Sequence, residues 1–156
     1  MTARLLVCDA GSVTHSDLAD DPRYVLDLRD PTDSDDCAAQ RWCHPEHHTA
    51  ACIKHLRMIP VRDGETVPAD AIVEAVAWYR AVRNEDPHAL VVIHCFAGVS
   101  RSATVAYAIL RACHGLDRFE ALRRVQTRIP RFDGVSVHPR EWIRCEAERL
   151  CDGGAT

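Results

Sequence analysis

The sequence predicts an α/β domain, with a central, mostly parallel sheet of four to five strands flanked by helices. The first observation is the continuous apolar run Leu90–His94, which is typical of a strand buried on both faces of a parallel sheet. The second is that helical patterns lie on both sides of this run. The third observation is that short β-rich segments precede the first helical pattern, so strands come first and then alternate with helices.

The first half of the chain supplies the remaining strands and one helix. Short β-rich segments at 4–8 and 24–28 are typical of strands, and Leu56–Val61 resembles a third. From Pro68 the apolar period becomes helical, and Pro87 prevents the helix from continuing far. Four apolar residues are expected on one face of this helix: Ile72, Val73, Val76 and Tyr79.

Helices follow the buried strand. Ser102–His114 has a helical apolar stripe, and Gly115 is a plausible C-terminal cap. Asp117 has the position of an N-cap for a further helix that Pro130 ends. A last helix is expected to begin near Pro139.

Length and charge narrow the class of protein. The 156 residues match one globular domain, so we expect a single domain over 1–156. A net charge of −4 argues against a general binder of nucleic acid or of membrane surfaces. The longest apolar runs, Leu5–Cys8 and Ala89–Ile93, are far shorter than the roughly 20 residues that span a bilayer. The N-terminus turns acidic too soon for a signal peptide, and eight Cys then indicate reduced thiols, so we expect a cytoplasmic protein.

The strongest chemical signal lies between the buried strand and the next helix, in Cys95-Phe96-Ala97-Gly98-Val99-Ser100-Arg101-Ser102. A loop of this length can form a cradle in which backbone N–H groups bind an anion. Gly98 supplies the conformational freedom that a curled loop requires, and the following helix adds its positive end. Arg101 can bind two oxygens of a phosphate.

The same surroundings act on Cys95. N–H donors, a helix N-terminus and a guanidinium all favour the thiolate, which makes Cys95 a nucleophile aimed at phosphorus. Ser102 can donate its hydroxyl to the sulfur and help it leave in a second step, although it could also simply be the N-cap of the helix. His94 is better placed to fix the loop by hydrogen bonds than to act as a base.

The segment His94-Cys95-x-x-Gly98-x-x-Arg101-Ser102 matches the signature of the cysteine-dependent protein tyrosine phosphatase superfamily. Its extension to residue 107 resembles the dual-specificity branch, and the resemblance covers about residues 18–150. It implies a phosphatase P-loop, in which residues 96–101 bind phosphate. It also implies hydrolysis of phosphotyrosine, with phosphoserine and phosphothreonine as further candidates, through a phosphocysteine intermediate and without metal or other cofactor.

This family places a general acid on a mobile loop upstream of the nucleophile. Asp63 follows the predicted strand Leu56–Val61 and is next to Gly64, which matches that place. The resemblance therefore implies that Asp63 protonates the leaving oxygen and then acts as base on the attacking water. Glu65 and Asp70 are weaker candidates, because Asp70 falls at the start of a helix and Glu65 lies beyond the aligned position.

Other functions stay open at this point. A Cys/His-rich stretch offers a zinc hypothesis, but it lacks the paired spacing of well-known zinc sites, so a solvated loop is favoured: Cys37, Cys43, His44, His47, His48, Cys52 and His55. Four further thiols are expected in the core or at the surface, and one of them could be a redox partner of Cys95: Cys8, Cys113, Cys145 and Cys151.

The substrate class is also open. A phosphoinositide or RNA 5′-phosphate is disfavoured because no Lys lies in the loop, and a non-catalytic phosphate-binding module would usually lose the Cys, the Arg or the acid. A sulfurtransferase or arsenate reductase would not need Asp63. The expected partner is a phosphorylated protein or peptide, with no nucleic acid and no membrane, and the chain is expected to be a monomer.

Overall fold

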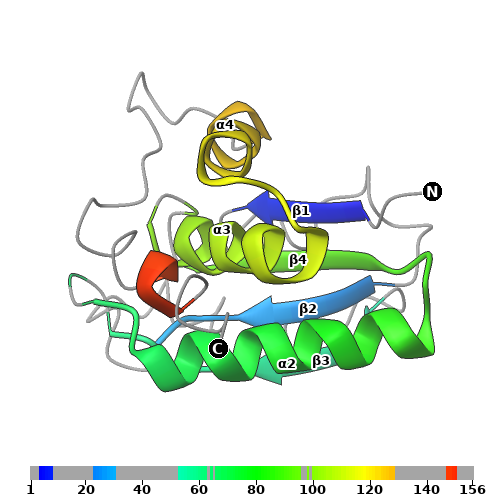
Figure 1. Ribbon diagram of the computed structural model, residues 1–156. Helices are drawn as coiled ribbons and strands as arrows, with labels where there is room; N and C mark the ends of the chain where they lie inside the picture. Colours follow the sequence, from blue (N-terminus) through cyan, green and yellow to red (C-terminus); the bar gives the residue numbers. More distant parts are fainter. Residues whose placement is uncertain are drawn as a thin grey trace.

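A computed structural model of the chain describes residues 4–8, 23–30, 53–62, 64, 66–95, 98, 100–128 and 147–150. Their elements, in chain order, are β1 (Arg4–Cys8), β2 (Arg23–Asp27), β3 (Ile53–Met58), α2 (Ala69–Glu85), β4 (Leu90–His94), α3 (Arg101–His114) and α4 (Arg118–Arg128). The strands form one parallel sheet in the order β1-β4-β2-β3 (Figure 1). The predicted α/β class with a parallel sheet is thereby confirmed.

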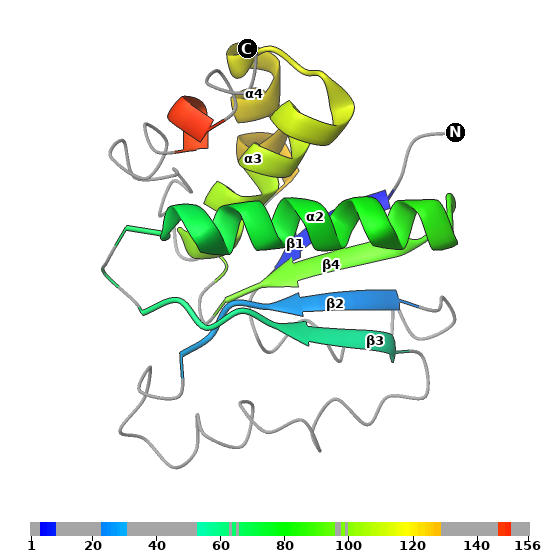
Figure 2. The ribbon, with the colours of Figure 1, turned by 60° about the horizontal axis from the view of Figure 1, so that its bottom comes forward.

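The strand β4 lies inside the sheet, between β1 and β2, and all five of its residues are buried. Val91 and Ile93 belong to the main core, to which α2 and α3 contribute on one face of the sheet (Figure 2). Leu90 and Val92 pack with Val25 in a second, smaller cluster. Burial on both faces explains why this strand is a continuous apolar run rather than an alternating one.

The strand β3 differs from the prediction of Leu56–Val61, because it begins and ends earlier, at Ile53–Met58. Pairing with β2 nevertheless continues beyond its last residue. The N–H of Ile59 donates to the carbonyl of Asp27 over 2.9 Å, and that of Val61 donates to the carbonyl of Leu28 over 3.2 Å. Residues 59–61 therefore run on alongside the end of β2 and leave the sheet only after Val61.

The helix α2 begins where predicted, directly after Pro68, but its buried face is different. The buried residues recur at helical spacing: Ala71, Ile72, Ala75, Tyr79 and Val82. Val73 follows Ile72 by about 100° of rotation and is 57% exposed, while Val76 is only half-buried. The prediction that all four apolar residues share the core face was wrong for Val73.

The helices after β4 have the predicted limits to within a residue. The helix α3 begins at Arg101 and is closed by Gly115, whose φ of 63° confirms the predicted cap. The Oδ1 of Asp117 accepts the N–H of Phe119 and of Glu120 over 2.8 and 2.9 Å, which confirms the N-cap of α4. The helix predicted near Pro139 lies outside the described residues, except that 147–150 are helical.

The core surrounds α3 for most of its length. Every residue of this helix from Arg101 to Leu110 is buried, including the polar ones, so the loop that leads into it is anchored at the helix end. In the described part of the chain, no helix has the length and apolarity needed to cross a membrane.

Candidate active site

The predicted site lies at the carboxyl edge of the sheet, where β4 ends and the chain turns toward α3. His94 is the last residue of β4 and Cys95 follows it, and their side chains are 0% and 2% exposed. Asp27 ends the neighbouring strand β2 and is paired with His94 in the sheet register. Carboxyl ends of parallel strands meet at one edge, which is where α/β proteins bind ligands.

Ser102 faces the thiol of Cys95. Its Oγ lies 3.3 Å from the Sγ of Cys95, within hydrogen-bond reach of sulfur, and its side chain is fully buried. Ser102 is the second residue of α3, and the N-cap position is held by Ser100. The simpler interpretation of Ser102 as the N-cap was therefore wrong, and its hydroxyl does not cap the helix.

The loop between Cys95 and α3 is described only in part. Gly98 is buried with a φ of 69°, so the prediction that the loop needs a glycine there is confirmed. The carbonyl of Ser100 accepts both the backbone N–H and the Oγ1 of Thr104, each over 2.9 Å, which ties the end of the loop into the helix. Phe96, Ala97 and Val99 lie outside the described residues, and their phosphate-binding role stays a prediction.

Arg101 lies at the first position of α3 and is 2% exposed. Its Nη1 donates to the carbonyl oxygen of Val61 over 2.7 Å, a contact between residues far apart in the sequence. Val61 comes two residues before Asp63. The predicted phosphate-binding arginine is therefore bonded to the segment that leads to the predicted acid.

Of the three candidate acids, the structure describes only Asp70. Asp63 and Glu65 lie outside the described residues, so the general-acid assignment stays a prediction. Asp70 lies in the first turn of α2, where its Oδ1 accepts the N–H of Ala71 over 2.9 Å. It therefore serves the start of the helix, as the sequence indicated.

His94 contacts backbone rather than the thiol itself. Its Nδ1 lies 3.4 Å from the carbonyl oxygen of Cys95, and its Nε2 lies 3.7 Å from the Oδ1 of Asp27. The ring is fully buried between these two oxygens. The role of His94 in supporting the loop stays a prediction.

Two charged residues near the site were missed by the sequence analysis. Asp27 and Arg29 are 1% and 2% exposed and form a buried ion pair beside His94. A signal was present, because two opposite charges at alternate positions interrupt the end of an otherwise apolar strand. Residues two apart on a strand share one face, so such a pair can close on itself.

The remaining thiols are unequally described as well. Cys113 lies at the far end of α3, about 16 Å along the helix axis from Ser102, the residue whose hydroxyl contacts the Cys95 thiol. A disulfide needs Cα atoms within about 7 Å, so Cys113 is not the redox partner of Cys95. Cys145 and Cys151 lie outside the described residues, as does the side chain of Cys8.

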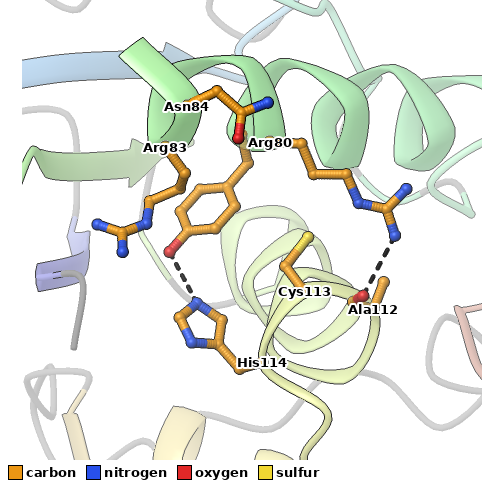
Figure 3. A pocket seen from close by; sticks show the side chains of 7 residues that line it. Arg80, Arg83, Asn84, Ala112, Cys113 and His114 are labelled. Carbon is orange, nitrogen blue, oxygen red and sulfur yellow. Dashed lines mark hydrogen bonds between the residues drawn. The ribbon is translucent and has the colours of Figure 1, made fainter. Parts of the chain in front are cut away.

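An open cavity of about 310 Å³ surrounds Cys113, away from the predicted site. Its lining comes from the facing ends of α2 and α3 (Figure 3): Tyr79, Arg80, Arg83, Asn84, Ala112, Cys113 and His114. Burial raises the pKa of the Cys113 thiol, although the nearby Arg80 opposes this. A raised pKa makes this thiol a poor nucleophile at neutral pH.

The zinc hypothesis concerned a stretch of which only His55 is described. Its ring stacks on that of Tyr24 with 5.1 Å between centroids, and its Nε2 lies 3.8 Å from the Oε1 of Glu85. These are contacts of a surface histidine. The other six Cys and His residues of the stretch lie outside the described residues.

No family model matches the chain. Dual specificity protein phosphatase 2 of Mus musculus is 39% identical over 102 residues, which cover 62% of this chain and 30% of that protein. The chain therefore spans less than a third of the length of the curated relative that it matches.

The similarity to solved structures covers a larger share of the chain than the similarity to this relative. Tk-PTP in its active form has a TM-score of 0.70 at 19% identity, covering 97% of this chain and 92% of that one. The human tyrosine phosphatase-like serine/threonine/tyrosine-interacting protein has a TM-score of 0.73 at 15% identity, with coverage of 97% and 93%. Human DUSP28 has a TM-score of 0.70 at 17% identity, with coverage of 96% and 92%. The chain is thus dual-specificity-phosphatase-like, in fold throughout and in sequence over the matched stretch.

Proposed function

We propose that this chain is a cysteine-dependent phosphatase that hydrolyses phosphotyrosine in proteins, and phosphoserine or phosphothreonine as well, through a phosphocysteine intermediate. The observation that carries the proposal is the buried cluster at the end of β4, where Ser102 lies 3.3 Å from the Cys95 thiol. Arg101 adjoins Ser102 in sequence and is bonded to Val61. A nucleophile, a donor for it and a guanidinium lie within one turn of helix and one loop.

In the first step, the thiolate of Cys95 attacks phosphorus and the P–O bond to the substrate breaks. The loop N–H groups and Arg101 hold the phosphoryl oxygens, whose charge spreads in the transition state. Asp63 gives its proton to the leaving oxygen, so the alcohol or phenol departs neutral. The sulfur is left bonded to the phosphoryl group.

In the second step, water attacks the phosphocysteine and the S–P bond breaks. Asp63, now a carboxylate, takes a proton from the water. The Ser102 hydroxyl donates to the departing sulfur, which stabilises the thiolate that is released. Inorganic phosphate leaves, and both Cys95 and Asp63 return to their starting states.

The charges that this chemistry needs come from protein groups, so we propose that it runs without metal or other cofactor. We also propose that residues 1–156 act as one catalytic domain and as a monomer in the cytoplasm. The solved structures that resemble the chain support the first point, because it covers nine-tenths of Tk-PTP in length.

The test uses p-nitrophenyl phosphate, measured with EDTA present and then with vanadate. We expect turnover that is insensitive to EDTA and blocked by vanadate. A rate that depends on added magnesium or zinc contradicts the mechanism, and a protein that binds phosphopeptide without turnover is a binding module. A panel of phosphotyrosine, phosphoserine and phosphothreonine peptides, a phosphoinositide and an RNA 5′-phosphate then decides the substrate class. Higher kcat/KM on either of the last two contradicts the protein-phosphatase proposal.

A further inference from the structure

We propose that Asp27 and Arg29 form a positioning pair that fixes the ring of His94 and, through it, the base of the loop that carries Cys95. The inference rests on the proposed function, since it concerns the same site. Neither residue is part of the motif that predicted the site. Their role follows from where the end of β2 lies and from what it touches.

The pair is closed on itself by several hydrogen bonds. The Nε of Arg29 donates to Oδ1 and Oδ2 of Asp27 over 2.9 and 3.1 Å, and Nη2 donates to Oδ2 over 2.6 Å. The backbone N–H of Arg29 donates to Oδ1 over 2.9 Å. Both side chains are almost fully buried, so this carboxylate has a fixed orientation.

The end of β2 joins the two segments that carry the predicted nucleophile and acid. On one side, the N–H of Leu28 donates to the carbonyl of His94 over 2.9 Å. On the other side, the carbonyls of Asp27 and Leu28 accept from Ile59 and Val61. A movement of Asp27–Arg29 would therefore displace both segments together.

The fixed carboxylate faces the imidazole. Oδ1 of Asp27 lies 3.7 Å from Nε2 of His94, and on its other side the ring approaches the carbonyl of Cys95 through Nδ1 at 3.4 Å. A rotation of the imidazole about its χ2 angle would move Nε2 away from this carboxylate and Nδ1 away from the carbonyl of Cys95. The peptide after Cys95 begins the anion cradle, so its orientation depends on this ring.

Stability alone does not explain such a pair. Burying two charges costs so much desolvation that apolar residues of similar volume are often at least as stabilising. In some proteins, polar groups retained in a core at that cost fix one arrangement of their neighbours. Here the neighbour is His94, whose ring in turn approaches the carbonyl of Cys95 at the base of the loop.

The test uses variants that conserve net charge, because charged or titratable groups from three elements lie around the end of β4. These are His94 from β4, Asp27 and Arg29 from the end of β2, and Arg101 from α3, with the Ser102 hydroxyl beside it. Asp27→Glu and Arg29→Lys each keep the charge but break the paired geometry. The double variant Asp27→Leu with Arg29→Met removes both charges and is expected to fold, since apolar replacement of a buried pair is tolerated.

The main readout is the pH profile of Cys95 alkylation by iodoacetamide, followed on the Cys95 peptide by mass spectrometry in protein shown to be folded. We expect the midpoint of this profile to rise by about half a pH unit to one unit in all three variants, because a looser cradle holds the thiolate less well. In the same variants kcat for p-nitrophenyl phosphate should fall about 10- to 100-fold, with KM changed much less.

The matched controls are Arg57→Lys and Glu74→Asp, which alter an exposed arginine–carboxylate pair between β3 and α2. They should leave alkylation and turnover unchanged. Folded Asp27 or Arg29 variants with the wild-type alkylation profile overturn the inference, as does a double variant that cannot fold, because the pair would then serve the fold alone. Alkylation needs no turnover, so a chain without phosphatase activity would refute the proposed function and still decide this one.

Discussion

Arg101 and Val61, 40 positions apart in the sequence, are joined by a hydrogen bond of 2.7 Å from the guanidinium Nη1 to the carbonyl oxygen. The bond leads from the first residue of α3 to the segment that continues into Asp63. A phosphoryl group bound by Arg101 would therefore lie next to the chain that carries the proposed acid. The predictions below test the parts of this arrangement one at a time.

Replacing the nucleophile should separate binding from turnover. Cys95→Ser should lower kcat by at least about a thousandfold, because an alkoxide forms far less readily than a thiolate. It should still bind a phosphotyrosine peptide, since the loop and Arg101 remain. Single-turnover assays and calorimetry on the same preparation measure the two effects, and an active Cys95→Ser enzyme refutes the mechanism.

Replacing the guanidinium by an ammonium should fail to preserve function. Arg101→Lys keeps the charge but loses the fork that binds two phosphoryl oxygens and the donor to Val61. We expect kcat/KM to fall by about 10²- to 10³-fold, which is the usual loss for one transition-state donor. Steady-state kinetics on p-nitrophenyl phosphate measure it, and near-normal rates would show that charge alone is sufficient.

The effect of the acid should depend on the leaving group. Asp63→Asn should lower kcat by roughly 10²- to 10⁴-fold on phosphotyrosine peptides, because the phenolate leaves reluctantly without a proton. The loss should shrink on aryl phosphates with very acidic phenols, and the basic limb of the pH–rate profile should flatten. Asp70→Asn is the control, since its carboxylate accepts the N–H of Ala71 in the first turn of α2. An equal loss on every leaving group would mean that Asp63 only shapes its loop.

Ser102 should affect the second step more than the first. Ser102→Ala removes the hydroxyl that lies 3.3 Å from the Cys95 sulfur. A hydrogen bond to a charged group contributes about 1.5–3 kcal/mol, so release of the thiolate should slow roughly 10- to 100-fold. Rapid-mixing assays should then show a burst of p-nitrophenol equal to the enzyme concentration. Slower substrate attack without a burst would place Ser102 in the first step instead.

The half-buried imidazole of His114, at the contact between α2 and α3, should make stability depend on pH. The Tyr79 hydroxyl lies 2.7 Å from Nε2 of His114. Burial, and then the charges of Arg83 and Arg124, lower the pKa of His114 from the ordinary value of 6.5. The unfolded chain therefore binds this proton more readily than the folded one.

This difference fixes the sign of the effect. The contribution of His114 is fully present above pH 6.5 and is lost as the pH falls from 6.5 toward the lowered pKa. The melting temperature should drop between pH 7 and pH 5, and it should drop less in His114→Gln. The difference between the two proteins isolates this residue from the other histidines, and identical pH profiles would rule out its role.

The sequence predicted those parts of the fold that depend on a local pattern of residues. Leu90–Ile93 is apolar throughout because both faces of the strand are covered, and Gly115 and Asp117 cap helices through local bonds. The limits of β3 were harder to predict, since it pairs only with β2 among the described strands and mixes polar with apolar residues. Its hydrogen bonds to β2, and not its composition, decide where it ends.

In the candidate site, too, some residues were predictable from the sequence and others were not. The loop residues Cys95, Gly98 and Arg101 were predictable because their spacing alone defines a cradle for an anion. The burial of Asp27 and Arg29 was not, because it depends on β4 and residues 59–61 lying on both sides of the end of β2. Which strands become neighbours is a property of the assembled sheet, and a linear pattern does not contain it.

The hydrogen bonds that Leu28 makes to both sides limit the length of this part of the chain. Successive residues of a strand point to opposite faces, so one residue inserted or deleted within 23–29 would turn Asp27 away from His94. It would also shift the partners of Ile59 and Val61 by one position. Related chains that keep this arrangement can therefore vary in the residues of 23–26 and at position 28, but they should not vary in the number of residues from 23 to 29.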